Sequence, residues 1–149
     1  MKILLVGPRS SGKMILANYF EEKEEPLRKV ASIVYHKRTI IVPDSYLESP
    51  WMHKHVIALQ QSADCGIFLQ PVTASRRSYP PNFAKAFRIP IYGVITYHEA
   101  YTEEGLRKAK GQLFSCGIEP IDGLLDLAKP NLCSIKKIIL EGGRDDGNI

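Results

Sequence analysis

The chain has 149 residues, of which 44% are hydrophobic and 24% charged, and twenty Lys and Arg side chains stand against sixteen Asp and Glu. No apolar run approaches the roughly 20 residues that a membrane-spanning helix needs, so the composition excludes an integral membrane protein. The apolar run at the N-terminus is also too short for a secretory signal. We expect one cytoplasmic domain over residues 1–142 and a flexible C-terminal tail over residues 143–149.

The net charge of +4 is mild, but residues 26–97 contain nine basic and three acidic side chains. This local excess fits a face that docks an anionic partner, and it equally fits ordinary solvated side chains. Cys65, Cys116 and Cys133 are widely spaced and lack the spacing of a zinc site. They are therefore predicted to be buried or free thiols in a reducing compartment.

Apolar runs alternate along the chain with amphipathic segments, which predicts an α/β fold with a mostly parallel sheet. Thr102 is expected to cap a helix at its start, and Gly117 to end it. In chain order, the pattern predicts strand 2–7, helix 13–23, a hairpin of strands 30–36 and 39–42, helix 51–62, strand 65–72, a loop over 75–81, helix 82–88, strand 91–97, helix 102–115, a weaker strand within 118–125 and helix 134–141.

The segment Gly7-Pro8-Arg9-Ser10-Ser11-Gly12-Lys13 fits the pattern G-x-x-x-x-G-K of a phosphate-binding loop, or P-loop. It lies between the first predicted strand and the first predicted helix, where such a loop has to lie. In this motif, successive backbone N–H groups surround an anion at the positive end of the helix, and the lysine adds a cation. We therefore predict phosphate binding by these residues and by Met14, with Arg9 either reaching a γ-phosphate or solvated.

The metal-binding part of such a site is altered. Met14 stands where a Ser or Thr hydroxyl would coordinate Mg²⁺, and a thioether is too soft a ligand to replace it. We expect Met14 to pack as an apolar helix residue. A second strand should end in an aspartate near the metal, but Ile41 stands at that position. Asp44 reaches the site only if its loop folds back, and otherwise forms a turn after Pro43. The sequence thus argues against bound Mg²⁺.

A guanine-specific site would need N/T-K-x-D after a later strand, and Thr96-Tyr97-His98-Glu99 stands in its place. Glu99 keeps a carboxylate that can accept from a base edge, but its additional methylene moves that carboxylate outward. Tyr97 replaces the lysine whose stem would cover the base. We assign Tyr97 and Glu99 as candidate base-binding residues, and we leave ATP and GTP open as the nucleotide.

Other residues give weaker signals. His53 and His55 are two residues apart on a predicted helix and point to different sides, so they do not form a metal pair. His98 is expected to face water. Arg76-Arg77 and Tyr79 have the composition of a nucleic-acid patch, but a lone arginine pair is more often a solvated loop. We expect no metal site, no nucleic-acid partner and no membrane partner.

These segments together resemble the EutP/PduV family, small P-loop proteins encoded with ethanolamine and propanediol utilisation systems and their bacterial microcompartments. The resemblance covers nearly the whole chain and rests on MKILLVGPRSSGK, PDSYLESPWMHKHVIALQQSADCGIFL and IPIYGVITYHE. The spacing of Pro43, Tyr46 and Pro50 is its most distinctive part. The resemblance implies a three-layer, Ras-like small GTPase fold, with shell or enzyme proteins of the microcompartment as partners.

The chain departs from the family pattern at Met14, Ile41 and Tyr97-His98-Glu99. These departures imply a degenerate, microcompartment-associated member with weak or no hydrolysis, because Mg²⁺ normally supplies much of the catalysis of phosphoryl transfer. The alternative is an active Mg²⁺-dependent enzyme, either a GTPase or ATPase or an acetate-kinase-like phosphotransferase. Its metal would be held by phosphates, water and Asp44. A third interpretation is an interaction domain whose loop is empty or binds sulfate.

Overall fold

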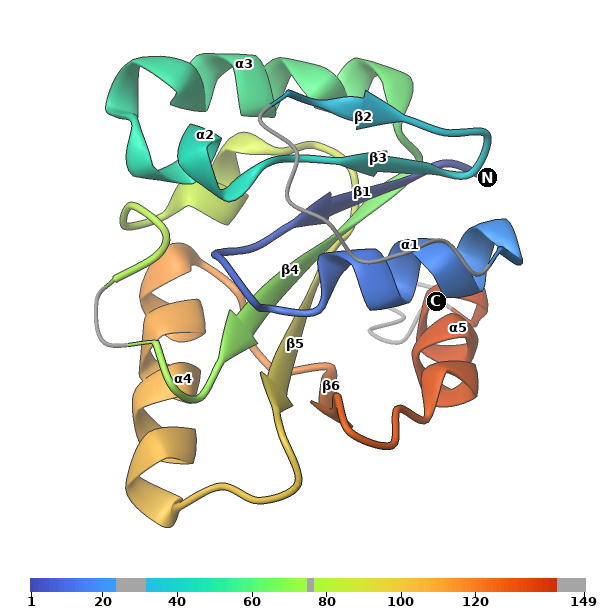
Figure 1. Ribbon diagram of the computed structural model, residues 1–149. Coiled ribbons are helices and arrows are strands. Elements are labelled where there is room, and N and C mark those ends of the chain that lie inside the picture. The colour runs from blue at the N-terminus through green and yellow to red at the C-terminus, as the bar shows by residue number, and fades with distance from the viewer. Residues whose placement is uncertain (24–31, 75–76, 142–149) are drawn as a thin grey trace.

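The computed structural model describes residues 1–23, 32–74 and 77–141. The described strands form a six-stranded sheet in the order β2-β3-β1-β4-β5-β6 (Figure 1). The β2–β3 pair is antiparallel and the other pairs are parallel. The central strand β1 therefore places the loop that follows it at the middle of one sheet edge. The strands are β1 (Ile3–Val6), β2 (Val34–Tyr35), β3 (Thr39–Ile41), β4 (Cys65–Pro71), β5 (Ile91–Tyr97) and β6 (Gly123–Asp126).

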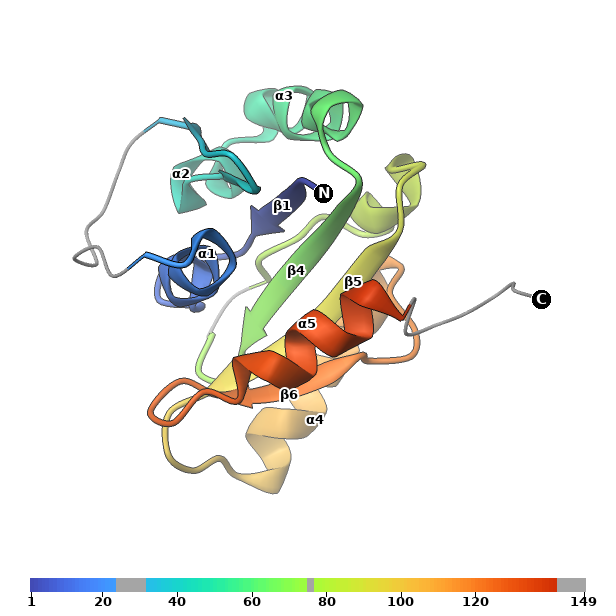
Figure 2. The same ribbon diagram turned by 90° about the vertical axis from the view of Figure 1, so that its right-hand side faces the viewer.

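Helices cover both faces of the sheet, so the fold has three layers. Figures 1 and 2 show α1 and α5 on one face and α4 on the other. None of the helices in the described ranges combines the length and apolar character needed to span a bilayer. The α-helices are α1 (Lys13–Glu21), α2 (Asp44–Glu48), α3 (His53–Ala58), α4 (Glu103–Cys116) and α5 (Leu132–Leu140); the 3₁₀ helices are η1 (Pro50–Met52), η2 (Leu59–Ser62) and η3 (Phe83–Ala86).

The two layers of helices pack on two separate hydrophobic clusters, and the central strand supplies both. In β1, Leu4 and Val6 join the cluster beneath α2, α3 and α4, whereas Ile3 and Leu5 join the cluster beneath α1 and α5. Successive strand residues point to opposite faces, and a parallel sheet covered on both sides needs apolar residues at every position. This explains why the short strands read as continuous apolar runs rather than as alternating patterns.

Several predicted elements are confirmed closely. Strand β5 has the predicted bounds, and α4 begins after Thr102, whose Oγ1 accepts a hydrogen bond of 2.9 Å from the N–H of Gly105. Gly117 ends that helix with a positive φ of 105°, a conformation that glycine adopts without strain. The predicted hairpin is present as the antiparallel β2–β3 pair. The predicted strand start at residues 30–31 and the tail 143–149 lie outside the described residues.

Other predictions are wrong in detail. The helix predicted over 51–62 is η1, α3 and η2 in succession, and the helix predicted over 82–88 is only the 3₁₀ turn Phe83–Ala86. The strand predicted within 118–125 begins later and ends one residue beyond that range, at Gly123–Asp126, because these residues pair with β5. Helix α2 was not predicted, since its five residues are too few to show a helical period.

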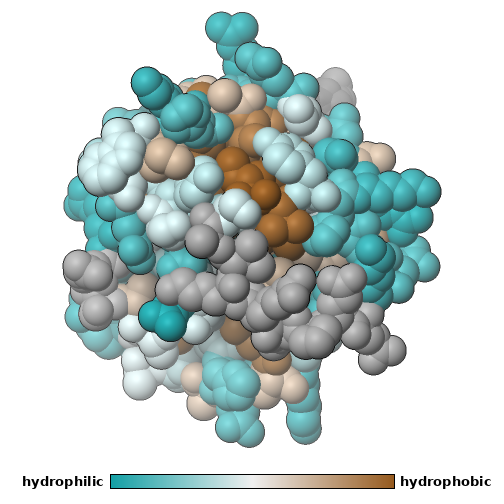
Figure 3. Space-filling model, turned by 45° about the horizontal axis from the view of Figure 1, so that its top comes forward, coloured by the Kyte–Doolittle hydropathy of each residue, from teal (hydrophilic) through white to brown (hydrophobic). Residues whose placement is uncertain are grey.

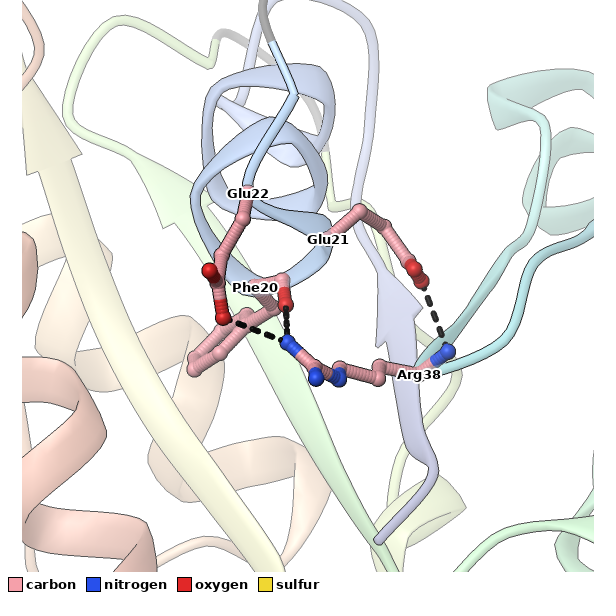
Figure 4. A network of polar contacts seen from close by, with 4 residues as sticks. All are labelled: Phe20, Glu21, Glu22 and Arg38. Atoms are coloured by element: carbon pink, nitrogen blue, oxygen red, sulfur yellow. Dashed lines mark hydrogen bonds and ion pairs between the residues drawn. The ribbon is translucent and has the colours of Figure 1, made fainter.

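The turn of the β2–β3 hairpin is tied to the C-terminal end of α1 by polar contacts of Arg38 (Figure 4). The Arg38 guanidinium donates to the Glu22 carboxylate at 2.7 Å and to the Phe20 carbonyl at 3.2 Å, and the Arg38 N–H donates to Glu21 at 2.8 Å. On the face that carries α3 and the hairpin, Figure 3 shows a mostly hydrophilic surface with a narrow hydrophobic strip. These contacts fix the hairpin turn against the C-terminal end of α1, which is the end away from the loop between β1 and α1.

Candidate functional site

A cavity of about 470 Å³ opens over the loop between β1 and α1. A volume of this size falls in the range of roughly 300–1,000 Å³ that is typical of small-molecule sites. Its described lining residues come from the loop, from α1, from the hairpin and from the ends of β5 and β6. They are Arg9, Ser10, Ser11, Gly12, Lys13, Met14, Ile15, Ser32, Val34, Ile41, Pro43, Asp44, His98 and Leu127.

The loop has the backbone geometry of an anion cradle. Gly12 has a φ of 103° at the start of α1, and in the described structure no side chain caps the first N–H groups of that helix. A Cβ on Gly12 would lie 2.7 Å from Leu127 Cδ2, and one on Gly7 would collide with Ser11 Oγ. Uncapped N–H groups at the positive end of a nine-residue helix attract anions. The local geometry therefore fits the phosphate groups of a nucleotide.

Ser11 provides a second sign of a ligand site. Its side chain is 1% exposed, and its Oγ has no hydrogen-bond partner among the described residues. A buried hydroxyl without a partner costs free energy, on the order of 1–3 kcal/mol. Because Ser11 also lines the cavity, its hydroxyl is a polar group available to an anion or a water molecule in the loop.

Lys13 links the loop to the hairpin. Its Nζ donates to the carbonyl oxygens of Gly7 at 2.7 Å and of Val42 at 2.8 Å. Burial lowers the pKa of Lys13 from 10.5 to about 8, although the nearby carboxylates of Asp44 and Glu48 act in the opposite direction. The ammonium is thus placed at the loop with two of its three N–H donors on carbonyl oxygens. An anion that enters the cavity restores the favourable charge environment that burial removes.

Most of the predicted phosphate-loop residues line the cavity, and two do not. The segment from Arg9 to Met14 lines the cavity, whereas Gly7 and Pro8 are not among the lining residues. Gly7 contributes instead through the carbonyl that accepts from Lys13. Pro8 is half-buried beside them.

The structure shows how Met14 packs and where Asp44 lies. Met14 is half-buried and packs on the cluster beneath α1 and α5, as an apolar helix residue does. Its thioether does not fit Mg²⁺. Asp44 does not form a simple turn: it begins α2 and lines the cavity, so the chain after Pro43 does fold back toward the loop. Asp44 is the one acidic residue among the described lining residues.

At the other end of the cavity, the structure brings together different residues from those predicted. Tyr97 and Glu99 are not among the described lining residues, whereas His98 and Leu127 are. Tyr97 packs edge-to-face on Tyr101, with ring centroids 4.7 Å apart. Glu99 has a φ of 69°, and its N–H donates to the Asp126 carboxylate at 2.8 Å. Leu127 was missed because it follows β6, the strand with the weakest sequence pattern.

Among the remaining candidates, Tyr79 and His53 have structural roles, and Arg76 lies outside the described residues. Tyr79 is 2% exposed and its hydroxyl donates to the Leu69 carbonyl at 2.6 Å, so it cannot stack on a nucleic-acid base. The His53 ring contacts the Leu47 carbonyl at 2.8 Å, while His55 is exposed. Within residues 1–23, 32–74 and 77–141, no group of three or more His, Cys, Asp or Glu is placed to hold a metal ion.

The three cysteines are free thiols, as predicted. Cys65 and Cys116 are buried and Cys133 is exposed. Burial raises the pKa of Cys65 and of Cys116 from 9.0 to about 11, so these two are protonated and inert near neutral pH.

The strand order and the loop between β1 and α1 define a P-loop protein with the fold of the small GTPases. A probable GTP-binding protein EngB has this fold, with a TM-score of 0.60, 13% identity and coverage of 97% of this chain and 99% of that one. The FeoB G-domain of Methanococcus jannaschii has a TM-score of 0.53 and 17% identity, with 97% and 100% covered. Era, solved with MgGDPNP and ribosomal RNA, has a TM-score of 0.59 and 16% identity, with 94% and 55% covered.

Comparison of the sequence with known families assigns the chain to one family of P-loop proteins. The profile of the family described as Ethanolamine utilisation - propanediol utilisation (PduV-EutP) matches residues 1–141, and the chain belongs to that family. The propanediol utilization protein PduV of Citrobacter freundii is 22% identical over 120 residues, covering 80% of each chain. The resemblance found in the sequence is thereby confirmed.

Proposed function

We propose that the protein binds the phosphate part of a nucleotide in its P-loop, turns it over slowly or not at all, and serves as an accessory protein of a bacterial microcompartment. The phosphate ligand would be held by the loop N–H groups and by Arg9, Ser10, Ser11 and Lys13. The accessory role rests on membership in a family described by ethanolamine and propanediol utilisation. Shell or enzyme proteins of such a compartment are the partners this role implies.

One observation carries the proposal: an intact phosphate cradle is combined with a metal position that has no hydroxyl. Gly12, Lys13 and the unpartnered Ser11 hydroxyl supply the cradle. Met14 offers sulfur packed on the core in the place where Mg²⁺ takes an oxygen. Charge neutralisation by a bound metal supplies a large part of phosphoryl-transfer catalysis, so a protein without it should bind phosphates better than it cleaves them.

The test is calorimetry with ATP, ADP, GTP and GDP, each with and without Mg²⁺. We expect Mg²⁺ to change the dissociation constant of the wild type by less than about threefold. The variant Met14→Ser adds the missing hydroxyl and should make binding tighten with Mg²⁺, whereas the matched control Met14→Ala loses the same thioether and should not. Strong Mg²⁺ dependence in the wild type would overturn the proposal.

A second function is favoured by the position of Asp44. Its carboxylate lines the cavity together with Lys13 and is a hard oxygen ligand of the kind that Mg²⁺ prefers. The alternative is therefore an active GTPase, ATPase or acetate-kinase-like phosphotransferase whose metal is held by phosphates, water and Asp44. That function predicts turnover of ATP or GTP that requires Mg²⁺, disappears in Lys13→Ala and falls strongly in Asp44→Asn.

A further inference from the structure

The cavity has two ends with different linings. We call the end at the loop between β1 and α1 the phosphate end, and the end at His98 and Leu127 the nucleoside end. Beyond the loop, the described lining is mainly apolar, with side chains from α1, from the hairpin and from the residue after β6. They are Ile15, Val34 and Leu127, with Ser32 and His98 as the polar residues of this end; Met14 and Ile41 lie at the metal position of the phosphate end. Such a wall can exclude water and pack against a sugar or a flat ring. The described lining here includes the single polar groups of Ser32 and His98, but no amide or carboxylate that could make a bidentate pair with the edge of a base.

The acidic residues beside His98 and Leu127 in the sequence, Glu99 and Asp126, do not line the cavity. Asp126 Oδ1 accepts from the N–H of Glu99 at 2.8 Å and from that of Ala128 at 2.9 Å. These two hydrogen bonds lower the pKa of Asp126, so it stays ionised as the anchor of the two loops. Neither Asp126 nor Glu99 is among the described lining residues. Asp44, the acidic residue that does line the cavity, is beside Lys13 at the phosphate end.

His98 is the aromatic side chain in the described lining, so it is the residue that can stack on a base. It is exposed, it lines the cavity, and its carbonyl accepts from the Ala100 N–H at 2.8 Å, which holds the tight turn at Glu99. An aromatic ring stacks on every base, because all bases have a π-face. Discrimination between bases depends instead on hydrogen bonds to their edges, worth roughly 5- to 150-fold for a good bidentate pair.

We propose that the cavity takes nucleoside polyphosphates without selecting the base, holding the phosphates in the loop and packing the nucleoside non-selectively on His98 and the apolar wall. This inference rests on the proposed phosphate-binding function and adds the ligand class. It assigns His98 as a nucleoside-contacting residue and removes Tyr97 and Glu99 from that role.

The test is calorimetry with ADP, GDP, CDP and UDP in the presence of a metal chelator, with pyrophosphate as the base-free probe. We expect the four dissociation constants to agree within about threefold, and each nucleotide to bind more tightly than pyrophosphate. His98→Ala should weaken all four nucleotides by a similar factor of about five and leave pyrophosphate unchanged. The matched control is His55→Ala, a histidine that is exposed on α3 and does not line the cavity.

The outcomes separate this inference from the function on which it rests. A preference of more than about tenfold for one base would overturn the inference while leaving phosphate binding intact. The inference would also be overturned if the nucleotides bound no more tightly than pyrophosphate, or if His98→Ala weakened pyrophosphate binding as much as nucleotide binding. Failure of pyrophosphate and of all four nucleotides to bind would overturn the phosphate-binding function itself, and the inference with it.

Discussion

Anion binding should depend on pH through Lys13. In the ligand-free protein, burial lowers the pKa of this ammonium to about 8, so the side chain loses its proton in an accessible pH range. A bound polyphosphate lies beside the ammonium and favours its charged form, which raises the pKa. Binding therefore takes up a proton above about pH 8, and the affinity must fall as the pH rises through this value.

The size of the effect follows from the pKa. With a free-state value of about 8, roughly three-quarters of Lys13 is protonated at about pH 7.5 and roughly a tenth at about pH 9. If the bound form stays protonated over this range, the dissociation constant should rise about eightfold, or about 1.2 kcal/mol. ADP is a suitable ligand, because a terminal phosphate with a second pKa near about 6 changes charge little over this range.

The assay is calorimetry with ADP from about pH 7.5 to pH 9, repeated at about pH 8 in buffers of different ionisation enthalpy, where we expect uptake of roughly half a proton. The control is Lys13→Arg, since a guanidinium keeps its charge at every pH used and its profile should be flat. The reasoning is refuted if the wild type binds equally well throughout and takes up no proton. It is also refuted if Lys13→Arg shows the same fall in affinity.

Three further predictions concern the loop, a helix cap and the thiols. Gly12→Ala forces a side chain into a left-handed backbone position with a close contact, and should cost about 1–3 kcal/mol in a denaturant titration and abolish ADP binding; unchanged binding would contradict the cradle geometry. Thr102→Val removes the cap of α4 at nearly constant volume and should lower the free energy of unfolding by about 1 kcal/mol, with ADP binding unaffected. A thiol reagent near neutral pH should label Cys133 rapidly, and Cys65 and Cys116 only after unfolding in guanidinium; rapid labelling of all three would show that the helices beside them open readily.

Much of the fold was accessible from the sequence. Strand β5 and the bounds of α4 were predicted because continuous apolar runs, a Thr cap and a terminal glycine are local signals. The strand within 118–125 was placed too early because Ile118 is buried and apolar without belonging to a strand. Its N–H bonds to the Leu113 carbonyl at the end of α4, so its hydrophobicity reflects the helix terminus and not a sheet.

The residues that line the cavity at the end of β5 and β6 could not be predicted in the same way. The motif position of Glu99 suggested a carboxylate at the base, but a left-handed turn and a hydrogen bond to Asp126 hold that segment differently. Asp126 is 27 residues away along the chain, so no local pattern connects the two residues. Leu127 could not be found from a local motif for the same reason. It follows β6, which is parallel to β5 and ends at the same sheet edge.

The sequence by itself determined the phosphate loop and the thioether at its metal position, because both depend on neighbours along the chain: a strand, two glycines, a lysine and the residue that follows. The tertiary structure decided what surrounds that loop. The parallel sheet brings the ends of β1, β3, β5 and β6 to one edge, and this places Asp44, His98 and Leu127 around one cavity. It also joins Lys13 to the Val42 carbonyl across 29 residues, and the burial that results sets the pKa of its ammonium.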